Sequence, residues 1–166
     1  MKLHHVLAAL SVAASSLVAL PASADVLDSC GKVNISGNAG TVYRSDDRGE
    51  HWTTLFGDYV SIDAFHLDPS GAIWFYGLNS TTLTEAIYLS KDEGATVSAQ
   101  GLTDYGVHGI TSNAAGDIFA ISKTNTLYRR KNGVGGWGAL GAITGSGALC
   151  TGMCVDSKQY LYAYFD

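Results

Sequence analysis

Carboxylates, histidines and cysteines are the side chains of this sequence that could do chemistry, and several carboxylates gather at one place. Asp46, Asp47 and Glu50 stand beside His51. Such a group could hold a cation, but its spacing matches no oxygen-ligand loop such as the EF-hand. A turn with solvated carboxylates explains the same residues, and we expect no metal site there.

The three cysteines, Cys30, Cys150 and Cys154, are candidates for a disulfide. A bond from Cys30 to either of the others would tie the two ends of the chain together and leave one thiol over. If Cys150 and Cys154 lie in one continuous strand, they are about 13 Å apart, too far to bond each other, although Gly152 could break the strand. A metal held by these thiols and a distant histidine lacks a matched fourth ligand. We expect neither a metal nor a cofactor.

The stretch from Ser45 to Trp52 has the residue types of a tight turn between two strands. The Asp47 carboxylate can accept hydrogen bonds from the backbone N–H groups that follow it. Gly49 supplies a positive φ that a side chain would resist, and Trp52 can fold its ring over the turn. The spacing Ser-x-Asp-x-Gly-x-x-Trp therefore predicts a structural role.

Partial copies of this stretch follow along the chain. A second copy begins at Tyr88, 45 positions after Tyr43. It keeps the serine, the aspartate and the glycine and has valine in place of the tryptophan: Ser90, Asp92, Gly94 and Val97. A looser third copy begins at Tyr128, where Asn132 stands for the aspartate and Trp137 for the tryptophan. Repeats of this length are typical of solenoids, propellers and arrays.

A second turn motif recurs out of phase with the first. It begins at Asp68, Asn113 and Asp156, with a weaker copy at Asp28, and an apolar strand follows each. The histidines that precede these turns lie at different offsets from them, which argues against a shared ring of histidine ligands.

The pattern from Ser45 to Trp52 resembles the Asp-box, the bacterial neuraminidase repeat found at hairpin turns of β-propeller blades. His51 stands where that family usually has threonine. The resemblance covers most of the chain as a repeat, although one copy carries all of the key residues. Relatives with this motif include sialidases, other glycosidases, sugar-binding lectins, sortilin-type receptors and assembly factors of photosystem II. Because all of them share it, the resemblance implies a fold and leaves the activity open.

The repeats and the resemblance predict an all-β chain of four-stranded antiparallel propeller blades, about three to three and a half of them. We expect whole blades at 59–99 and 107–140, flanked by parts of blades at 33–55 and 149–165. Closed propellers typically have four to eight blades, and open strand edges favour aggregation. The edges would be covered by pairing between the two ends of the chain, by a second copy in a homo-oligomer, or by the rest of a longer propeller.

The first 24 residues have the pattern of a secretory signal peptide. A short basic start at Lys2 precedes the apolar run 6–20, and Ala22-Ser23-Ala24 is a cleavage site. We expect residues 25–166 to form one propeller domain that is secreted or periplasmic. No later stretch reaches the roughly 18 apolar residues of a membrane span. A net charge of −5 without a basic cluster argues against nucleic acid and anionic membranes as partners.

Catalysis is the less favoured interpretation. A sialidase, as that family is known, uses three arginines, a tyrosine with an acidic partner as nucleophile, and an aspartate acid. The Phe/Tyr-Arg-Ile-Pro signature of that family is absent. The arginines after residue 24 all adjoin expected outer turns, and there are four of them: Arg44, Arg48, Arg129 and Arg130. A glycosidase that uses an inner-strand carboxylate such as Asp63 is one alternative. A scaffold that helps to assemble an exported complex is another.

Binding of a carbohydrate or a protein without catalysis is the function we expect. Ligand pockets combine aromatic faces with a few placed polar groups. The aromatic candidates are Trp74, Tyr76, Tyr105, Trp137 and Tyr162. Tyr105 lies beside Gly106 in a connecting segment and is favoured over Trp74 and Trp137, whose positions also suit packing between blades.

Overall fold

The computed structural model describes residues 40–144 and 148–166. The expected signal peptide, the weak turn at Asp28, the expected strand at 33–35 and Cys30 lie outside these residues. The described parts contain strands and one short 3₁₀ turn: β1 (Val42–Arg44), β2 (Thr53–Phe56), β3 (Tyr59–Leu67), β4 (Ile73–Asn79), β5 (Glu85–Ser90), β6 (Ser98–Gly101), β7 (Val107–Ser112), β8 (Ile118–Ser122), β9 (Thr126–Arg130), η1 (Lys131–Gly133), β10 (Gly138–Ala142), β11 (Cys150–Val155) and β12 (Leu161–Phe165).

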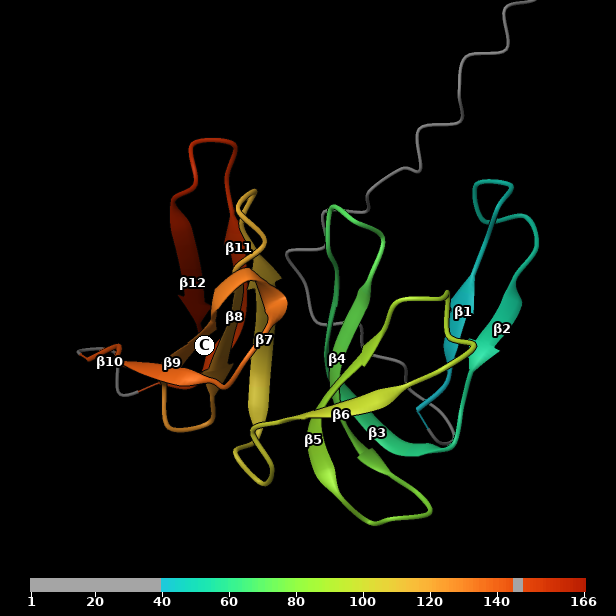
Figure 1. Ribbon diagram of the computed structural model, residues 1–166, viewed down its shortest axis with the longest axis horizontal. Helices are drawn as coiled ribbons and strands as arrows, with labels where there is room; N and C mark the ends of the chain where they lie inside the picture. Colours follow the sequence, from blue (N-terminus) through green and yellow to red (C-terminus); the bar gives the residue numbers. More distant parts are fainter. Residues whose placement is uncertain (1–39, 145–147) are drawn as a thin grey trace, which may run out of the picture.

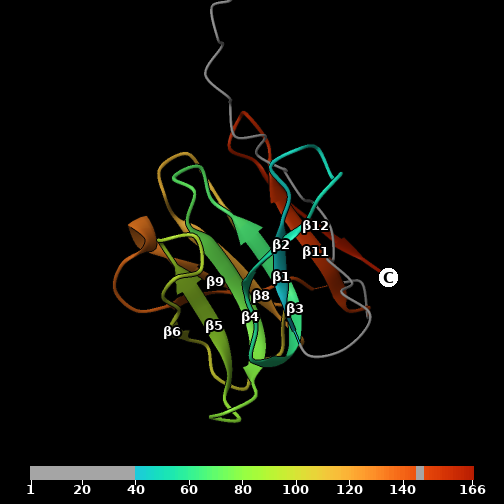
Figure 2. The same cartoon turned by 90° about the vertical axis from the view of Figure 1, so that its right-hand side faces the viewer.

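These strands form four antiparallel sheets, which we number as blades in chain order. Blade 1 is β1–β2, blade 2 is β3–β4–β5–β6, blade 3 is β7–β8–β9–β10 and blade 4 is β11–β12. In Figure 1, β1–β2 lies at the right, blade 2 lies in the middle, and blades 3 and 4 lie together at the left; Figure 2 shows the same strands from the side. The first strands of blades 2, 3 and 4 lie against their neighbours, β3 against β7 and β7 against β11. The predicted all-β fold of four-stranded antiparallel blades is confirmed.

Blades 2 and 3 bury both of their faces, because each packs between two neighbouring blades and successive side chains of a strand point to opposite sides of the sheet. In β4, Trp74 and Tyr76 belong to the core between blades 2 and 3. Ile73 and Phe75 belong instead to the core between blades 1 and 2. A third cluster around Ile121 joins blades 3 and 4. The uninterrupted apolar run of β4 is therefore explained by burial on both faces.

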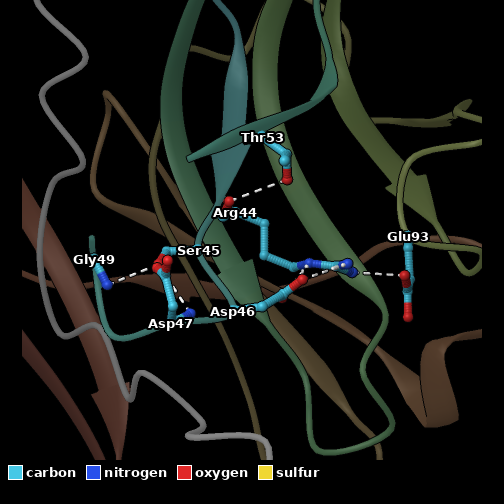
Figure 3. A network of polar contacts seen from close by, with 7 residues as sticks. All are labelled: Arg44, Ser45, Asp46, Asp47, Gly49, Thr53 and Glu93. Carbon is cyan, nitrogen blue, oxygen red and sulfur yellow. Dashed lines mark hydrogen bonds and ion pairs between the residues drawn. The ribbon is translucent and has the colours of Figure 1, made fainter. Parts of the chain in front are cut away.

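The turn from Ser45 to Trp52, which we call the first Asp-box turn after the pattern that it resembles, is held together by a serine hydroxyl and a carboxylate (Figure 3). Ser45 Oγ accepts the N–H of Gly49 at 2.7 Å and donates to Asp47 Oδ1 at 2.8 Å. Asp47 Oδ1 also accepts the N–H of His51 at 2.8 Å. Gly49 has φ +97°, which a side chain would strain. The turn satisfies its backbone donors with its own side chains.

The second Asp-box turn repeats the first. Ser90 Oγ accepts the N–H of Gly94 at 2.8 Å, and Asp92 Oδ1 accepts the N–H of Thr96 at 2.8 Å. The hydroxyl of Thr96 donates to Asp92 Oδ2 at 2.6 Å. Because Thr96 is bound into the turn, the strand expected at 96–99 begins only at Ser98.

His51 takes the place of Thr96 in the first turn, since its ring Nδ1 contacts Asp47 Oδ2. The histidine thus supplies the contact that a threonine hydroxyl supplies in the second turn. The N–H and ring of His51 lower the pKa of Asp47, and the hydroxyl and N–H of Thr96 lower the pKa of Asp92. The unusual residue at position 51 preserves the turn.

Arg44 connects the two Asp-box turns across the boundary between blades 1 and 2 (Figure 3). Its Nε lies 2.9 Å from Asp46, and its Nη1 lies 2.6 Å from Glu93 in the turn of blade 2. All three side chains are exposed enough for water to screen these ion pairs. The contact therefore sets the position of the two turns more than it stabilises the fold.

The third copy of the Asp-box pattern is built differently. Its Gly133 comes one place early and Arg130 replaces the serine, so the chain forms the 3₁₀ turn η1 with Asn132 at φ +50°. The N–H of Asn132 donates to Asp117 Oδ1 at 2.8 Å. Trp137 packs against the core between blades 2 and 3, whereas Trp52 donates from Nε1 to Gly49 O at 3.1 Å and stays exposed over its turn.

The turns that begin at Asp68 and Asp156 use a carboxylate to hold an aromatic ring. Asp68 Oδ1 accepts the N–H of Ala72 at 3.0 Å, and Oδ2 accepts Trp74 Nε1 at 3.0 Å. Asp156 Oδ1 accepts the N–H of Tyr160 at 2.8 Å, and Oδ2 accepts the Tyr162 hydroxyl at 3.0 Å. Each carboxylate thus fixes both the turn and the ring six residues on.

The corresponding turn of blade 3 has no ring donor to satisfy. Asn113 Oδ1 accepts the N–H of Asp117 at 2.9 Å. The residue six positions on is Phe119, which carries no donor. An aspartate therefore occurs where the later ring can donate, and an asparagine occurs where it cannot.

Replacing Gly77 by alanine should destabilise the fold strongly. A Cβ at Gly77 would lie 2.3 Å from the carbonyl oxygen of Ser61 in β3, so the two strands would have to separate. We expect Gly77→Ala to lower the free energy of unfolding by about 1–3 kcal/mol or more. Gly136→Ala is the control, because no heavy atom lies within 4 Å of its Cβ position. Urea denaturation measures both, and equal losses would contradict the close approach.

Replacing Asp68 by asparagine should lower stability and flatten its pH dependence. Burial alone would raise the pKa of Asp68, but hydrogen bonds from Ser70, Trp74 and Ala72 outweigh it and hold the pKa below its ordinary value. A carboxyl with a lowered pKa contributes stability above its unfolded pKa of about 3.9, and this stability is lost as pH falls through the folded value. We expect Asp68→Asn to cost about 1–3 kcal/mol at pH 7 and less at pH 3.

Denaturation of this variant at pH 7, 5 and 3 measures the effect. The control is Asp58→Asn, because the carboxylate of Asp58 makes no hydrogen bond within the residues that the structure describes. A loss in Asp68→Asn that is the same at every pH would show that the charge of Asp68 is not what stabilises the turn.

Candidate functional site

A groove lies where the turns of blades 2 and 3 meet, and we call it the rim groove. Its volume is about 360 Å³. One wall is the turn 68–72, the other is the turn that begins at Asn113 together with η1 and Val134, and Lys91 adds a side chain from blade 2. Two turns from neighbouring repeats therefore build one concave site.

The floor of the rim groove is apolar and fixed. Trp74 and Ile118 contribute to it and are 2% and 1% exposed. The Trp74 ring is held by its bond to Asp68, and the Arg130 guanidinium lies 5.7 Å from the ring centroid, a cation–π distance. Burial lowers the pKa of Arg130. Gly133 lies beside the ring, and a Cβ there would be 3.6 Å from it, an ordinary van der Waals contact.

The rim of the groove carries a cation and an amide with unused hydrogen-bonding capacity. Within the described parts of the chain, neither Lys91 Nζ nor the side chain of Asn132 makes a hydrogen bond. Lys91 stands between Ser90 and Asp92, so the second Asp-box turn positions it. Asp68 is different, because both of its oxygens already accept bonds from its own turn and from Trp74.

An apolar floor with a few polar groups above it is the usual composition of a ligand site. The volume of about 360 Å³ falls at the lower end of the range for such sites. A lysine ammonium donates only, whereas an asparagine amide both donates and accepts. The groove can therefore bind a segment that combines an apolar group with backbone-like polar groups or a carboxylate.

The structure brings one of the five aromatic candidates into this groove, and that residue is Trp74. Tyr76 is fully buried and accepts the N–H of Gly106 at 2.7 Å through its hydroxyl, and burial raises its pKa. Tyr105 is 44% exposed and lies edge-on to Tyr128 with ring centroids 5.4 Å apart.

The other two candidates lie at separate places. Trp137 donates from Nε1 to Gln100 O at 2.9 Å and packs between blades 2 and 3. Tyr162 is 51% exposed on blade 4, and its bond to Asp156 raises its pKa. The five aromatic residues therefore do not form one binding surface.

Lys91 and Asn132 were not among the residues that the sequence singled out. The available signal was the repeat itself, because turns at equivalent positions of neighbouring repeats lie on the same rim of a propeller. That reasoning would have placed the Asp68 and Asn113 turns side by side and pointed to the residues around them.

The groups that suggested metal or catalytic chemistry are engaged elsewhere. Asp47, Glu50 and His51 have ligand atoms within 4.8 Å of one another, but Asp47 already accepts bonds from its own turn. Asp63 accepts the Ser61 hydroxyl at 3.2 Å. Arg129 lies 3.9 Å from Asp117, far along the chain from the ion pairs of blade 1.

Cys150 and Cys154 both lie in β11, and neither forms a disulfide within the described residues. Burial raises the pKa of the Cys150 thiol. Pairing with Cys30 stays a prediction, because Cys30 lies outside the described residues. Of the helices in the described part of the chain, none is long and apolar enough to cross a membrane.

Comparison with known proteins gives matches in structure only. No protein-family model matches the chain, and no curated protein matches it. The chain is similar to the solved structure of YCF48 bound to D1 peptide, with a TM-score of 0.50, 16% identity, and coverage of 75% of this chain and 40% of that one.

Two further structures are similar. One is the nidogen/laminin complex, with a TM-score of 0.56, 16% identity, and coverage of 70% of this chain and 44% of that one. The other is a putative gluconolactonase, with a TM-score of 0.59, 18% identity, and coverage of 74% and 49%. The chain thus spans less than half the length of each of these three structures. All three are β-propeller proteins, and at this level of identity the likeness shows that the chain has a β-propeller fold.

Proposed function

We propose that this chain is an exported, non-catalytic recognition module that binds an extended peptide segment of a protein partner in the rim groove. The observation that carries the proposal is an apolar floor, Trp74 and Ile118, beside two polar side chains that make no hydrogen bond within the described residues, those of Lys91 and Asn132. Residues 1–24, which have the pattern of a signal peptide, support export.

An extended peptide fits these groups because its backbone presents an N–H and a C=O at each residue. The Asn132 side-chain amide can donate to a C=O of the peptide and accept from an N–H, and Lys91 can bind a carbonyl or a carboxylate. An apolar side chain of the peptide would pack on the floor and on Val134, which is exposed at the rim. We therefore expect a segment with an apolar residue next to an acidic or amide residue.

The groove supports binding rather than catalysis. Its carboxylate, Asp68, has a lowered pKa and hydrogen bonds to both oxygens, so it is a poor general acid or base near neutral pH. Two of the similar structures are YCF48 bound to D1 peptide and the nidogen/laminin complex, which is in line with binding of a peptide or protein at this fold. A shared fold does not identify the ligand, so the ligand has to be identified by experiment.

Selection from a random peptide library, with the exported chain as bait, tests the proposal. Dissociation constants of the selected peptides are then measured by fluorescence anisotropy. Lys91→Ala and Asn132→Ala should each weaken binding by about tenfold, the effect of losing one hydrogen bond worth about 1.4 kcal/mol. Lys158→Ala is the matched control, because it removes the same charge from an exposed lysine in the turn of blade 4.

The result could contradict the proposal in three ways. Peptide binding that is insensitive to Lys91→Ala and Asn132→Ala would place the site elsewhere. Glycan-array binding that depends on these two residues would replace the peptide by a carbohydrate. Release of a chromogenic glycoside, abolished by Asp63→Asn, would replace recognition by hydrolysis.

A further inference from the structure

The two half-blades of this chain correspond to complementary halves of a whole blade. β12 follows the Asp156 turn as β4 and β8 follow the turns at Asp68 and Asn113. β1 precedes an Asp-box turn as β5 does, and β9 precedes η1 at the equivalent place. In both whole blades these strands pair, β4 with β5 and β8 with β9. β11–β12 is thus the first half of a blade, and β1–β2 is the second half.

The repeats also fix the register in which the halves would pair. In blade 2, Phe75 lies opposite Tyr88, and in blade 3, Ala120 lies opposite Tyr128. Counted from the turns, the same positions in the half-blades are Ala163 and Tyr43. A small residue opposite a tyrosine, as in blade 3, would therefore recur between β12 and β1.

Within one chain these halves stand apart. Figure 1 shows β1–β2 and β11–β12 at opposite ends of the row of blades. Among the described residues, β12 pairs only with β11, and β1 pairs only with β2. Tyr43 and Tyr162 are 50% and 51% exposed, whereas Tyr88 and Trp74, their equivalents in blade 2, are 6% and 2% exposed. Among the described residues, neither half therefore lies beside the strands that would complete its blade.

We propose that two copies of this chain join head to tail, with β12 of each copy pairing antiparallel to β1 of the other. Each junction would complete a four-stranded blade in the order β11–β12–β1–β2. The described residues of each copy form two whole blades and two halves, so two copies would close a ring of six blades. Six lies within the four to eight blades of closed propellers, whereas one copy closed on itself would have three. A two-fold axis makes both junctions identical.

This arrangement is independent of the rim groove, which lies between the two whole blades of one copy. The ring would carry two such grooves. The competing arrangements are a strand from residues 25–39 against β1 of the same copy, and open half-blades that require further blades. In neither of these arrangements does β12 of one copy pair with β1 of another. The solution mass of the chain and cross-linking between copies therefore distinguish both of them from the proposal.

The first measurement is the mass of the exported chain by light scattering after gel filtration, and we expect twice the chain mass. The second is a cysteine cross-link. Tyr43→Cys combined with Ala163→Cys should form a disulfide between copies, because residues directly opposite in paired strands are within bonding reach. Peptide mapping identifies this bond apart from any that the native cysteines form.

Tyr43→Cys combined with Leu161→Cys is the control, since it moves one partner by two residues, about 7 Å along the strand. We expect at least a tenfold lower yield of its cross-link. A folded monomer would overturn the proposal, as would a 43–163 bond within one copy. Equal yields from the matched and shifted pairs would also overturn it, because they would show contact without the stated register.

Discussion

A short carboxylate or amide at the start of each turn is the interaction on which the rest of this structure depends. A turn between two strands leaves backbone N–H groups without partners, and leaving them buried and unbonded is costly. Asp68, Asn113 and Asp156 solve this for the turns before β4, β8 and β12, each accepting the N–H four residues on. Asp47 and Asp92 do the same for the turns after β1 and β5. The strands start where they do because the turns are closed in this way.

The same turns place the groups that could recognise a ligand. Asp68 holds the indole of Trp74 from one side, and the Arg130 guanidinium lies over it from another, so the floor of the rim groove has little freedom. Lys91 comes from an Asp-box turn, and Asn132 from a turn that departs from the Asp-box pattern. The groove is thus a by-product of packing one repeat against the next, and its polar groups come from residues that the turns do not need.

Much of the fold could be predicted from the sequence because its signals are local. The blade expected to begin at residue 59 does begin there with β3, and the spacing from Ser90 to Gly94 predicted a turn that repeats the first. The third copy does not form the turn that the Asp-box pattern predicted. Its glycine comes one place early, and the chain forms the 3₁₀ turn η1 instead. The strand expected at 136–140 appears as Gly138–Ala142, since the longer turn before it delays the start.

The candidate site was less predictable than the fold. Trp74 was singled out as an aromatic residue, and it lies in the groove. Tyr76 was singled out on the same grounds and enters the same core as Trp74, but it is fully buried, and its hydroxyl accepts the N–H of Gly106. Lys91 and Asn132 carry no local signal of binding, although Asn132 was noted as the residue in the aspartate position of the third copy. Their proximity arises from contact between two repeats, and single-sequence patterns do not encode which side chains remain unbonded after that contact forms.

The phenol of Tyr76 connects blade 2 to the segment that leads into blade 3. Its hydroxyl accepts the N–H of Gly106 at 2.7 Å, and its ring is fully buried. In a repeat protein, stability is approximately a sum of terms within repeats and terms between neighbours. If blade 3 separated from blade 2, the Tyr76 hydroxyl and the Gly106 N–H would lose their hydrogen bond. The apolar core between the two blades would also become exposed to water. Blades 2 and 3 should therefore melt as one cooperative unit rather than one after the other.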